Sequence, residues 1–302
     1  MRSLPTFSKV LVFTGLLLCF SALSGFIGQD LAALLTGEQF TLALEAPLPS
    51  GPGGWSSLNI SMAISQIVGF GGAVGMYLWL FGGTTGWADL RWRAPSALNT
   101  SSARIWLLSI VATLTIAPLL LWSFNLNAAL IPEGGALESF ARPLEDYLER
   151  MTTFMLSVDG LGQRAVMLIV VALLPALFEE LTFRGVLQPL MIQLTGRPWV
   201  GIIVTATIFS FIHFQFYGFL PRILLGLLFG WLVYRTGSLW PAILAHFVNN
   251  AAAAITFWAT GTIDSPELPL LSLYGLGITA VFVAALYGLS RYSASPLPQT
   301  TP

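Results

Sequence analysis

The stretch that decides the fold is Leu168-Ile-Val-Val-Ala-Leu-Leu-Pro-Ala-Leu-Phe-Glu179-Glu180-Leu-Thr-Phe-Arg184-Gly185. Apolar residues surround two adjacent glutamates and continue from 162 to 193, which exceeds the roughly 20 residues that a membrane-spanning helix needs. An ionisable side chain inside a bilayer costs at least about 2.5–3.5 kcal/mol, and such residues usually mark a functional site. The stretch therefore predicts a membrane helix that carries a buried polar site.

The whole chain has the composition of a membrane protein. Of its 302 residues, 55% are hydrophobic and only 9% are charged, and the mean hydropathy is +0.78. A soluble domain carries about 25% charged residues. The net charge of −1 and the pI near 6.1 argue against a nucleic-acid partner, which calls for a basic surface. The single cysteine, Cys19, excludes an intrachain disulfide and a cysteine-rich metal site.

Apolar segments recur along the chain. We place them at 8–28, 60–83, 104–126, 162–193, 198–217, 219–235, 238–260 and 268–290. We expect the first to be an uncleaved helix rather than a signal peptide, because many further segments follow it. The pairs Gly226/Gly230 and Gly71/Gly75 predict close helix packing. The fold class is therefore all-α, a polytopic membrane helix bundle of about eight transmembrane helices.

The distribution of charge between the segments predicts their orientation. With the N-terminus in the cytoplasm, the inner side receives most of the basic residues, namely Arg2, Lys9, Arg91, Arg93, Arg104, Arg197, Arg235 and Arg291. This matches the positive-inside rule, with both termini cytoplasmic. The chain is compatible with the inner (plasma) membrane of a bacterium.

Three regions outside the apolar segments have a character of their own. Within the connection 131–160, apolar side chains recur at helical spacing from Pro143 onward, opposite acidic ones, which predicts an amphipathic helix at the membrane interface. A lid over a substrate entrance is the alternative for this helix. Residues 46–57 are rich in proline and glycine, which predicts an external loop, and the tail from Ser293 has the composition of a disordered segment.

The two adjacent glutamates are expected to differ in their partners. Glu180 and Arg184 are four residues apart, share a helix face and can form an ion pair. Glu179 is rotated by about 100° from Glu180, so it reaches the same arginine less easily and is free for chemistry. The alternative is a purely structural cluster in which both carboxylates pair with Arg184. Pro175 can kink the helix and free a carbonyl nearby.

Two further apolar segments each carry a histidine. His213 shares a helix face with Phe209, and His246 shares one with Asn250, because each pair is four residues apart. These are the two histidines of the chain, and both lie in apolar segments. We estimated how deep each side chain lies in the membrane from its position along its helix. These depths allow Glu179, His213, His246 and Asn250 to form one cluster inside the membrane.

A carboxylate, two imidazoles and a carboxamide can activate water against a carbonyl. Glu179 and His213 can take a proton from water, and His246 and Asn250 can donate hydrogen bonds to the oxyanion that forms. Alternatively, Glu179, His213 and His246 can hold Zn²⁺ with an open fourth position. The sequence leaves both options open, although it lacks the His-Glu-x-x-His motif of many zinc proteases.

These motifs resemble those of a known family. Glu179-Glu180-x-x-x-Arg184, Phe209-x-x-x-His213 and His246-x-x-x-Asn250, in that order in apolar segments, are similar to the three motifs of the CAAX protease and bacteriocin-processing family, also called CPBP or Abi. The resemblance covers about 170–260. It implies an intramembrane endopeptidase, a hydrolase, with Glu179 as general base and His213 sharing the water. It further implies that His246 and Asn250 line the oxyanion side and that Glu180, Arg184 and Phe209 support the site.

The resemblance also divides the chain. We expect N-terminal transmembrane helices in 1–130, the extracytoplasmic connection in 131–160, the catalytic core in 161–261, and the last helix with a cytoplasmic tail in 262–302. The expected partners are the lipid bilayer and a peptide or protein substrate. The sequence leaves open the identity and lipidation of this substrate and the oligomeric state. It also leaves open whether the enzyme is a metalloprotease or works without a metal. The competing functions are a proton- or cation-coupled transporter and a catalytically silent immunity or scaffold protein.

Overall fold

The computed structural model describes residues 4–38, 48, 50–82, 100–262, 270 and 272–291. Within these ranges the regular structure is helical, with no strand. The elements are α1 (Thr6–Thr36), α2 (Gly51–Ile64), η1 (Ser65–Gly72), α3 (Ala73–Phe81), α5 (Thr100–Thr115), α6 (Ala117–Ala129), α7 (Ala136–Leu156), α8 (Leu161–Met167), η3 (Leu168–Leu173), α9 (Leu174–Glu180), η4 (Leu181–Leu187), α10 (Gln188–Thr195), α11 (Pro198–Phe211), α12 (Phe219–Thr236), α13 (Trp240–Thr260) and α14 (Leu273–Ser290). The three η elements are π-helical segments.

Seven of the described helices are long and apolar enough to cross a membrane. They are Thr6–Thr36, Gly51–Phe81, Ala103–Ala129, Leu161–Thr195, Phe219–Thr236, Trp240–Thr260 and Leu273–Ser290. The chain is thus a multi-pass membrane protein, and the prediction of an all-α polytopic bundle is confirmed. The eighth predicted span is α11, whose 14 residues extend about 21 Å and so fall short of a hydrocarbon core about 30 Å thick.

One predicted boundary is wrong for an identifiable reason. The loop expected at 46–57 contains the start of α2, which begins at Gly51 with Pro52 in its first turn. Proline is tolerated there because the first-turn N–H groups have no partner within the helix. The span expected at 104–126 is confirmed as Ala103–Ala129, which comprises α5 and α6 with Pro118 in the first turn of α6. Arg2, Arg91, Arg93 and the tail from Ser293 lie outside the described residues.

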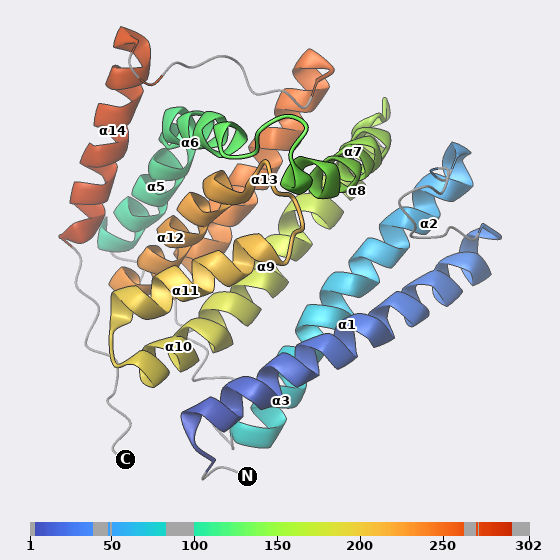
Figure 1. The fold of residues 1–302 in the computed structure, drawn as a ribbon, viewed down its shortest axis with the longest axis horizontal. Coiled ribbons are helices and arrows are strands. Elements are labelled where there is room, and N and C mark those ends of the chain that lie inside the picture. Colours follow the sequence, from blue (N-terminus) through green and yellow to red (C-terminus); the bar gives the residue numbers. More distant parts are fainter. Residues whose placement is uncertain are drawn as a thin grey trace.

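The helices form a bundle around one composite helix (Figure 1). The span Leu161–Thr195, built from α8, η3, α9, η4 and α10, has the most buried apolar window of the seven spans, at 50%. On one side, α1 packs against α2 and η1, and η1 contacts α9. On the other side, α11, α12 and α13 follow one another in contact, and α5 packs against α13 and α14. The start of α1 and the end of α14 lie at the same end of the bundle (Figure 1).

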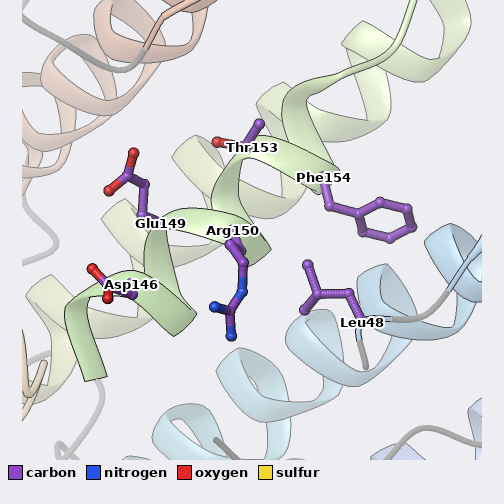
Figure 2. A pocket seen from close by; sticks show the side chains of 6 residues that line it. All are labelled: Leu48, Asp146, Glu149, Arg150, Thr153 and Phe154. Atoms are coloured by element: carbon purple, nitrogen blue, oxygen red, sulfur yellow. The ribbon is translucent and has the colours of Figure 1, made fainter. Parts of the chain in front are cut away.

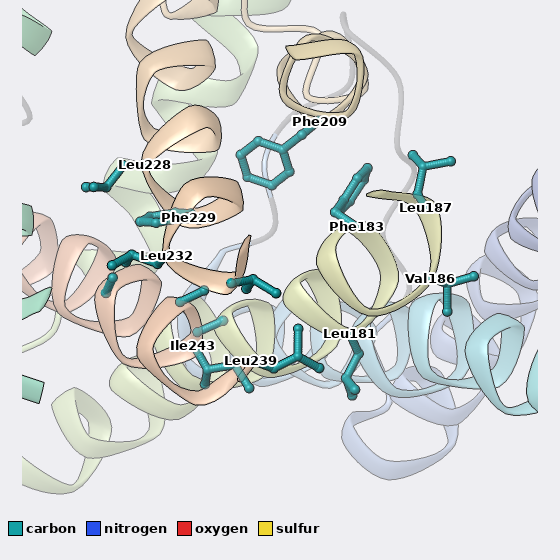
Figure 3. Packing of buried hydrophobic residues seen from close by; sticks show 14 of the residues in the cluster. Leu181, Phe183, Val186, Leu187, Phe209, Leu228, Phe229, Leu232, Leu239 and Ile243 are labelled. Carbon is teal, nitrogen blue, oxygen red and sulfur yellow. The ribbon is translucent and has the colours of Figure 1, made fainter. Parts of the chain in front are cut away.

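A close-packed core fills the space between η4, α11, α12 and α13. Figure 3 shows Phe183, Phe209 and Phe229 pointing into this space from three different helices, next to leucines of α12 and η4. The predicted close packing is confirmed for Gly226, because a Cβ added there would lie 2.9 Å from Cβ of Ala206. It is wrong for Gly75, where an added Cβ would meet nothing within 4 Å.

The amphipathic helix predicted within 131–160 is α7. Its buried side chains include Tyr147 and Met155, whereas Phe140 and Glu149 are exposed. A surface groove runs beside it, lined by Leu48, Asp146, Glu149, Arg150, Thr153 and Phe154 (Figure 2). None of the predicted site residues lines this groove.

Candidate active site

The short helix α9 places Glu179 and Glu180 between two π-helical segments. The segment η3 precedes α9 and η4 follows it, and widened π-helical turns occur frequently at functional sites. Since consecutive helix residues are about 100° apart, the two side chains leave the helix in different directions. Both are buried, and each meets a different set of partners.

Glu180 and Arg184 form the predicted ion pair. Nη1 of Arg184 lies 2.8 Å from Oε1 of Glu180, and both side chains are 0% exposed. Nη2 of Arg184 donates to the carbonyl of Gly226 at 3.0 Å. Oε1 of Glu180 also accepts from Nδ1 of His246 at 2.9 Å. The pair therefore links α9, η4, α12 and α13 and fixes the orientation of the His246 ring.

Glu179 occupies a separate position, as the sequence predicted. Its Oε1 accepts a hydrogen bond from Nε2 of Gln66 at 3.0 Å. Its Oε2 lies 3.9 Å from Nε2 of His213 and 4.0 Å from Nε2 of His246. The alternative in which both glutamates pair with Arg184 is not what the structure shows, because the arginine's ion pair is with Glu180. Three predicted site residues thus come together around one gap.

The outer hydrogen bonds of the two imidazoles determine which atoms face this gap. Nδ1 of His213 lies 2.7 Å from the carbonyl oxygen of Phe209, and a carbonyl can only accept, so this nitrogen carries the hydrogen. Nδ1 of His246 donates in the same way to the carboxylate of Glu180. In the neutral rings, both Nε2 atoms are then acceptors. Together with the carboxylate Oε2 of Glu179 they make three acceptors, which a donor of hydrogen bonds or a cation can satisfy.

The spacing of Glu179 from each histidine matches that of two groups bridged by one water molecule. A water oxygen about 2.8 Å from both atoms of either Glu179–histidine pair would subtend an angle of roughly 90°, which is an acceptable hydrogen-bonding geometry. A zinc ion bonded at about 2.0–2.1 Å to the same atoms would have to hold them roughly 145° apart, far from the tetrahedral value of about 109°. Among the described residues, no three metal-binding side chains are close enough together to hold an ion. As arranged, these side chains do not fit zinc.

Aromatic rings enclose the polar cluster. The Phe229 ring stacks on the ring of His246 with centroids 5.1 Å apart, and the Phe209 ring meets His213 edge-on at 4.9 Å. The guanidinium of Arg184 lies 4.7 Å above the centre of the Phe209 ring. These contacts keep water from Glu180 and Arg184, and their apolar surroundings strengthen the ion pair's electrostatic interaction. Phe209 thus packs against both His213 and Arg184, and its supporting role stays a prediction.

The hydrogen bonds of Asn250 are made with residues outside the predicted site. Its side-chain amide donates to the carbonyl of Val171 at 3.1 Å, and its Oδ1 accepts from Asn249. Pro175, four residues after Val171, has no N–H to offer this carbonyl. Val171 lies in the π-helical segment η3, where carbonyls pair with the N–H five residues on, so the freeing of a carbonyl by Pro175 stays a prediction. The amide of Asn250 retains a second N–H beyond the one it uses here.

His213 lies in an irregular corner rather than in a helix. The corner spans 212–218 between α11 and α12, and it contains Phe214 at φ 53°, a value that bulky residues rarely adopt. Asn127 of α6 holds the corner, since its amide donates to the carbonyl of Phe216 and its Oδ1 accepts from the backbone N–H of Leu220. The side chain of His213 is 28% exposed, against 8% for Glu179 and 5% for His246.

The corner also packs against α7, which lies outside the spans. The ring of Phe140 meets that of Phe216 at 5.5 Å, and the guanidinium of Arg142 lies over the ring of Tyr217. These two ring contacts with α7 restrain the corner that carries His213.

Two carboxyl groups of α7 have shifted pKa values. The hydrogen bond from Arg142 lowers the pKa of the Glu138 carboxyl, and burial raises the pKa of the Glu145 carboxyl.

Two residues of the site were missed by the sequence analysis. Gln66 and Asn127 both carry a side-chain amide inside an apolar span, and that polarity was the available signal. Nothing local connects them to the motifs, because Gln66 precedes Glu179 by 113 residues and Asn127 precedes Phe216 by 89.

Comparison with known proteins supports the motif assignment. Residues 161–252 match the family model described as "Type II CAAX prenyl endopeptidase Rce1-like". No curated protein and no solved structure matches the chain. The matched segment contains all three motifs, so the resemblance to the CAAX protease family is confirmed for this part of the chain. It indicates a membrane-embedded protease.

Proposed function

With residues 161–252 matched to a CAAX endopeptidase model within a multi-pass membrane protein, we propose that the chain is an intramembrane endopeptidase. In this proposal Glu179 and His213 activate a water molecule that hydrolyses a peptide bond. The observation that carries it is the position of Oε2 of Glu179, which lies 3.9 Å from Nε2 of His213 and 4.0 Å from Nε2 of His246, a spacing that one bridging water molecule can span.

The proposed reaction begins with transfer of a proton from this water to Oε2 of Glu179 or Nε2 of His213. The hydroxide adds to the carbonyl carbon of the substrate and gives a tetrahedral intermediate. When the C–N bond breaks, the same proton passes to the leaving nitrogen, so that the products are a carboxylic acid and an amine. Proton transfer of this kind contributes roughly 10²–10⁴-fold to the rate.

His246 is proposed to stabilise the oxyanion. Glu180 holds the ring through Nδ1, and Nε2 lies 4.0 Å from Oε2 of Glu179. In the proposed reaction Nε2 carries a hydrogen when it donates to the oxyanion. The second amide N–H of Asn250 is a further proposed donor, after a side-chain rotation toward the gap.

The location of the protein is proposed from the charge pattern. Both termini are placed in the cytoplasm of a bacterial cell, with α7 on the outer side. The end of the bundle that holds the start of α1 and the end of α14 is then cytoplasmic (Figure 1).

The test is a cleavage screen. Purified wild type and the isosteric variant Glu179→Gln are incubated in detergent with a library of quenched fluorescent peptides, including lipidated ones. We expect cleavage of some peptides by wild type and none by the variant. Equal cleavage by both proteins would remove Glu179 as the base. Proton uptake into proteoliposomes by a wild type that cleaves nothing would favour the transporter instead.

A further inference from the structure

Gln66 is an uncharged polar side chain in the second membrane span, far in sequence from the motifs. It belongs to the π-helical segment η1, and its amide donates to Oε1 of Glu179 at 3.0 Å. The segment matched by the endopeptidase model begins at residue 161 and does not include it. We propose that Gln66 is a positioning residue of the active site, which holds the carboxylate of Glu179 with Oε2 toward the water. The proposal rests on the proposed function.

The two oxygens of Glu179 have different surroundings, and Gln66 accounts for the difference. Oε1 is bonded to Gln66, whereas Oε2 faces the Nε2 atoms of His213 and His246. Neither imidazole is close enough to bond directly to the carboxylate. Among the described residues, Gln66 therefore supplies the direct hydrogen bond that prevents this carboxylate from rotating away from the water.

The segments η1 and α9 pack closely against each other. A Cβ added to Gly71 of η1 would lie 2.8 Å from the ring of Phe178, the residue before Glu179. The absence of a side chain at Gly71 lets η1 lie against the helix that carries the base. The Gln66–Glu179 bond and the Gly71–Phe178 contact thus join the same two segments at two points, which fixes the donor relative to the acceptor.

A positioning role differs measurably from a purely structural one. A hydrogen bond between membrane helices can serve folding alone, and its loss then lowers the amount of folded protein. If Gln66 orients the base, its loss slows the chemical step in protein that is still folded. Misplacing a reacting group by about 1 Å can cost about 100-fold in rate. We therefore expect kcat of the Gln66 variant to fall by roughly 10- to 100-fold while KM stays within about twofold.

The experiment compares two amide deletions in the same span. Gln66→Met removes the donor and keeps an unbranched chain of similar length. Asn59→Leu is the matched control, because the amide of Asn59 donates to the carbonyl of Trp55 within its own helix. The substrate is a quenched peptide that wild type cleaves and Glu179→Gln does not. The proposal expects a lower kcat for Gln66→Met and wild-type kinetics for Asn59→Leu. An unchanged kcat for Gln66→Met, or an equal loss in both variants, overturns it.

A second measurement does not depend on activity. Thermal unfolding in detergent is recorded for Gln66→Met, Glu179→Met and the double variant, because methionine at position 179, unlike glutamine, has no oxygen to accept the hydrogen bond from Gln66. If the two side chains interact as described, the shift of the double variant is smaller than the sum of the single shifts. Additive shifts overturn the contact and the proposal with it. If wild type cleaves no peptide while the shifts are non-additive, the proposed function and the positioning role of Gln66 both fail and only the contact remains.

Discussion

Replacing Arg184 by methionine removes the positive partner of a fully buried carboxylate. Glu180 and Arg184 are both 0% exposed and joined at 2.8 Å, so the variant leaves Glu180 charged inside the bundle. Breaking a buried pair in this way costs about 3–5 kcal/mol. The double variant Glu180→Gln/Arg184→Met leaves no unpaired charge, and we expect it to lose only about 1–2 kcal/mol, mainly through the hydrogen bond to Gly226.

The chain supplies its own control for this prediction. Glu138 and Arg142 have the same i,i+4 spacing and the same N–O distance of 2.8 Å, but the pair is solvent-exposed on α7. The assay is thermal unfolding in detergent, followed by the fluorescence of the ten tryptophans. We expect Arg184→Met to unfold well below wild type, the double variant between them, and Arg142→Met close to wild type. The reasoning is refuted if Arg184→Met is no less stable than Arg142→Met, or if the double variant is less stable than Arg184→Met.

Three further outcomes follow from packing, hydrogen bonding and site geometry. Gly226→Ala should cost about 1–3 kcal/mol because its Cβ would crowd Ala206, whereas Gly75→Ala should leave the unfolding midpoint unchanged or slightly raised. Asn127→Leu should lower both the unfolding midpoint and the cleavage rate, because it leaves the carbonyl of Phe216 without its donor; stability equal to wild type would contradict this. Purified active enzyme should contain less than about 0.1 zinc per chain by elemental analysis, and a chelator should leave its rate unchanged, because the donor spacing does not fit zinc; stoichiometric zinc would contradict this.

The fold class was predictable from the sequence because membrane spans depend on local composition. Runs of apolar residues and rare charges identify spanning helices whatever their tertiary contacts. The errors occurred where composition is ambiguous. Pro52 and its neighbouring glycines resemble a loop, yet they form the first turns of α2. The apolar residues after Phe211 continue a hydropathy signal, but the chain turns there into the corner that carries His213.

The candidate site was predictable in part, because its motifs obey helical spacing. Glu180 and Arg184 pair as i,i+4 neighbours, and the depths estimated along separate helices brought Glu179 and the two histidines together. Gln66 could not be assigned, since its contact with Glu179 depends on how η1 packs against α9. The bond from Asn250 to Val171 likewise depends on the packing of α13 against η3.

The central claim is that Glu179 is the base of a peptide hydrolase. The most direct test is to measure how far the cleavage rate falls when Glu179 is replaced. With a peptide that wild type cleaves, kcat/KM is measured for wild type, Glu179→Gln and the control Glu138→Gln, whose carboxylate lies on α7. The account predicts a loss of roughly 10²–10⁴-fold for Glu179→Gln and a wild-type value for Glu138→Gln. A Glu179→Gln enzyme that retains kcat/KM within about tenfold of wild type would contradict it.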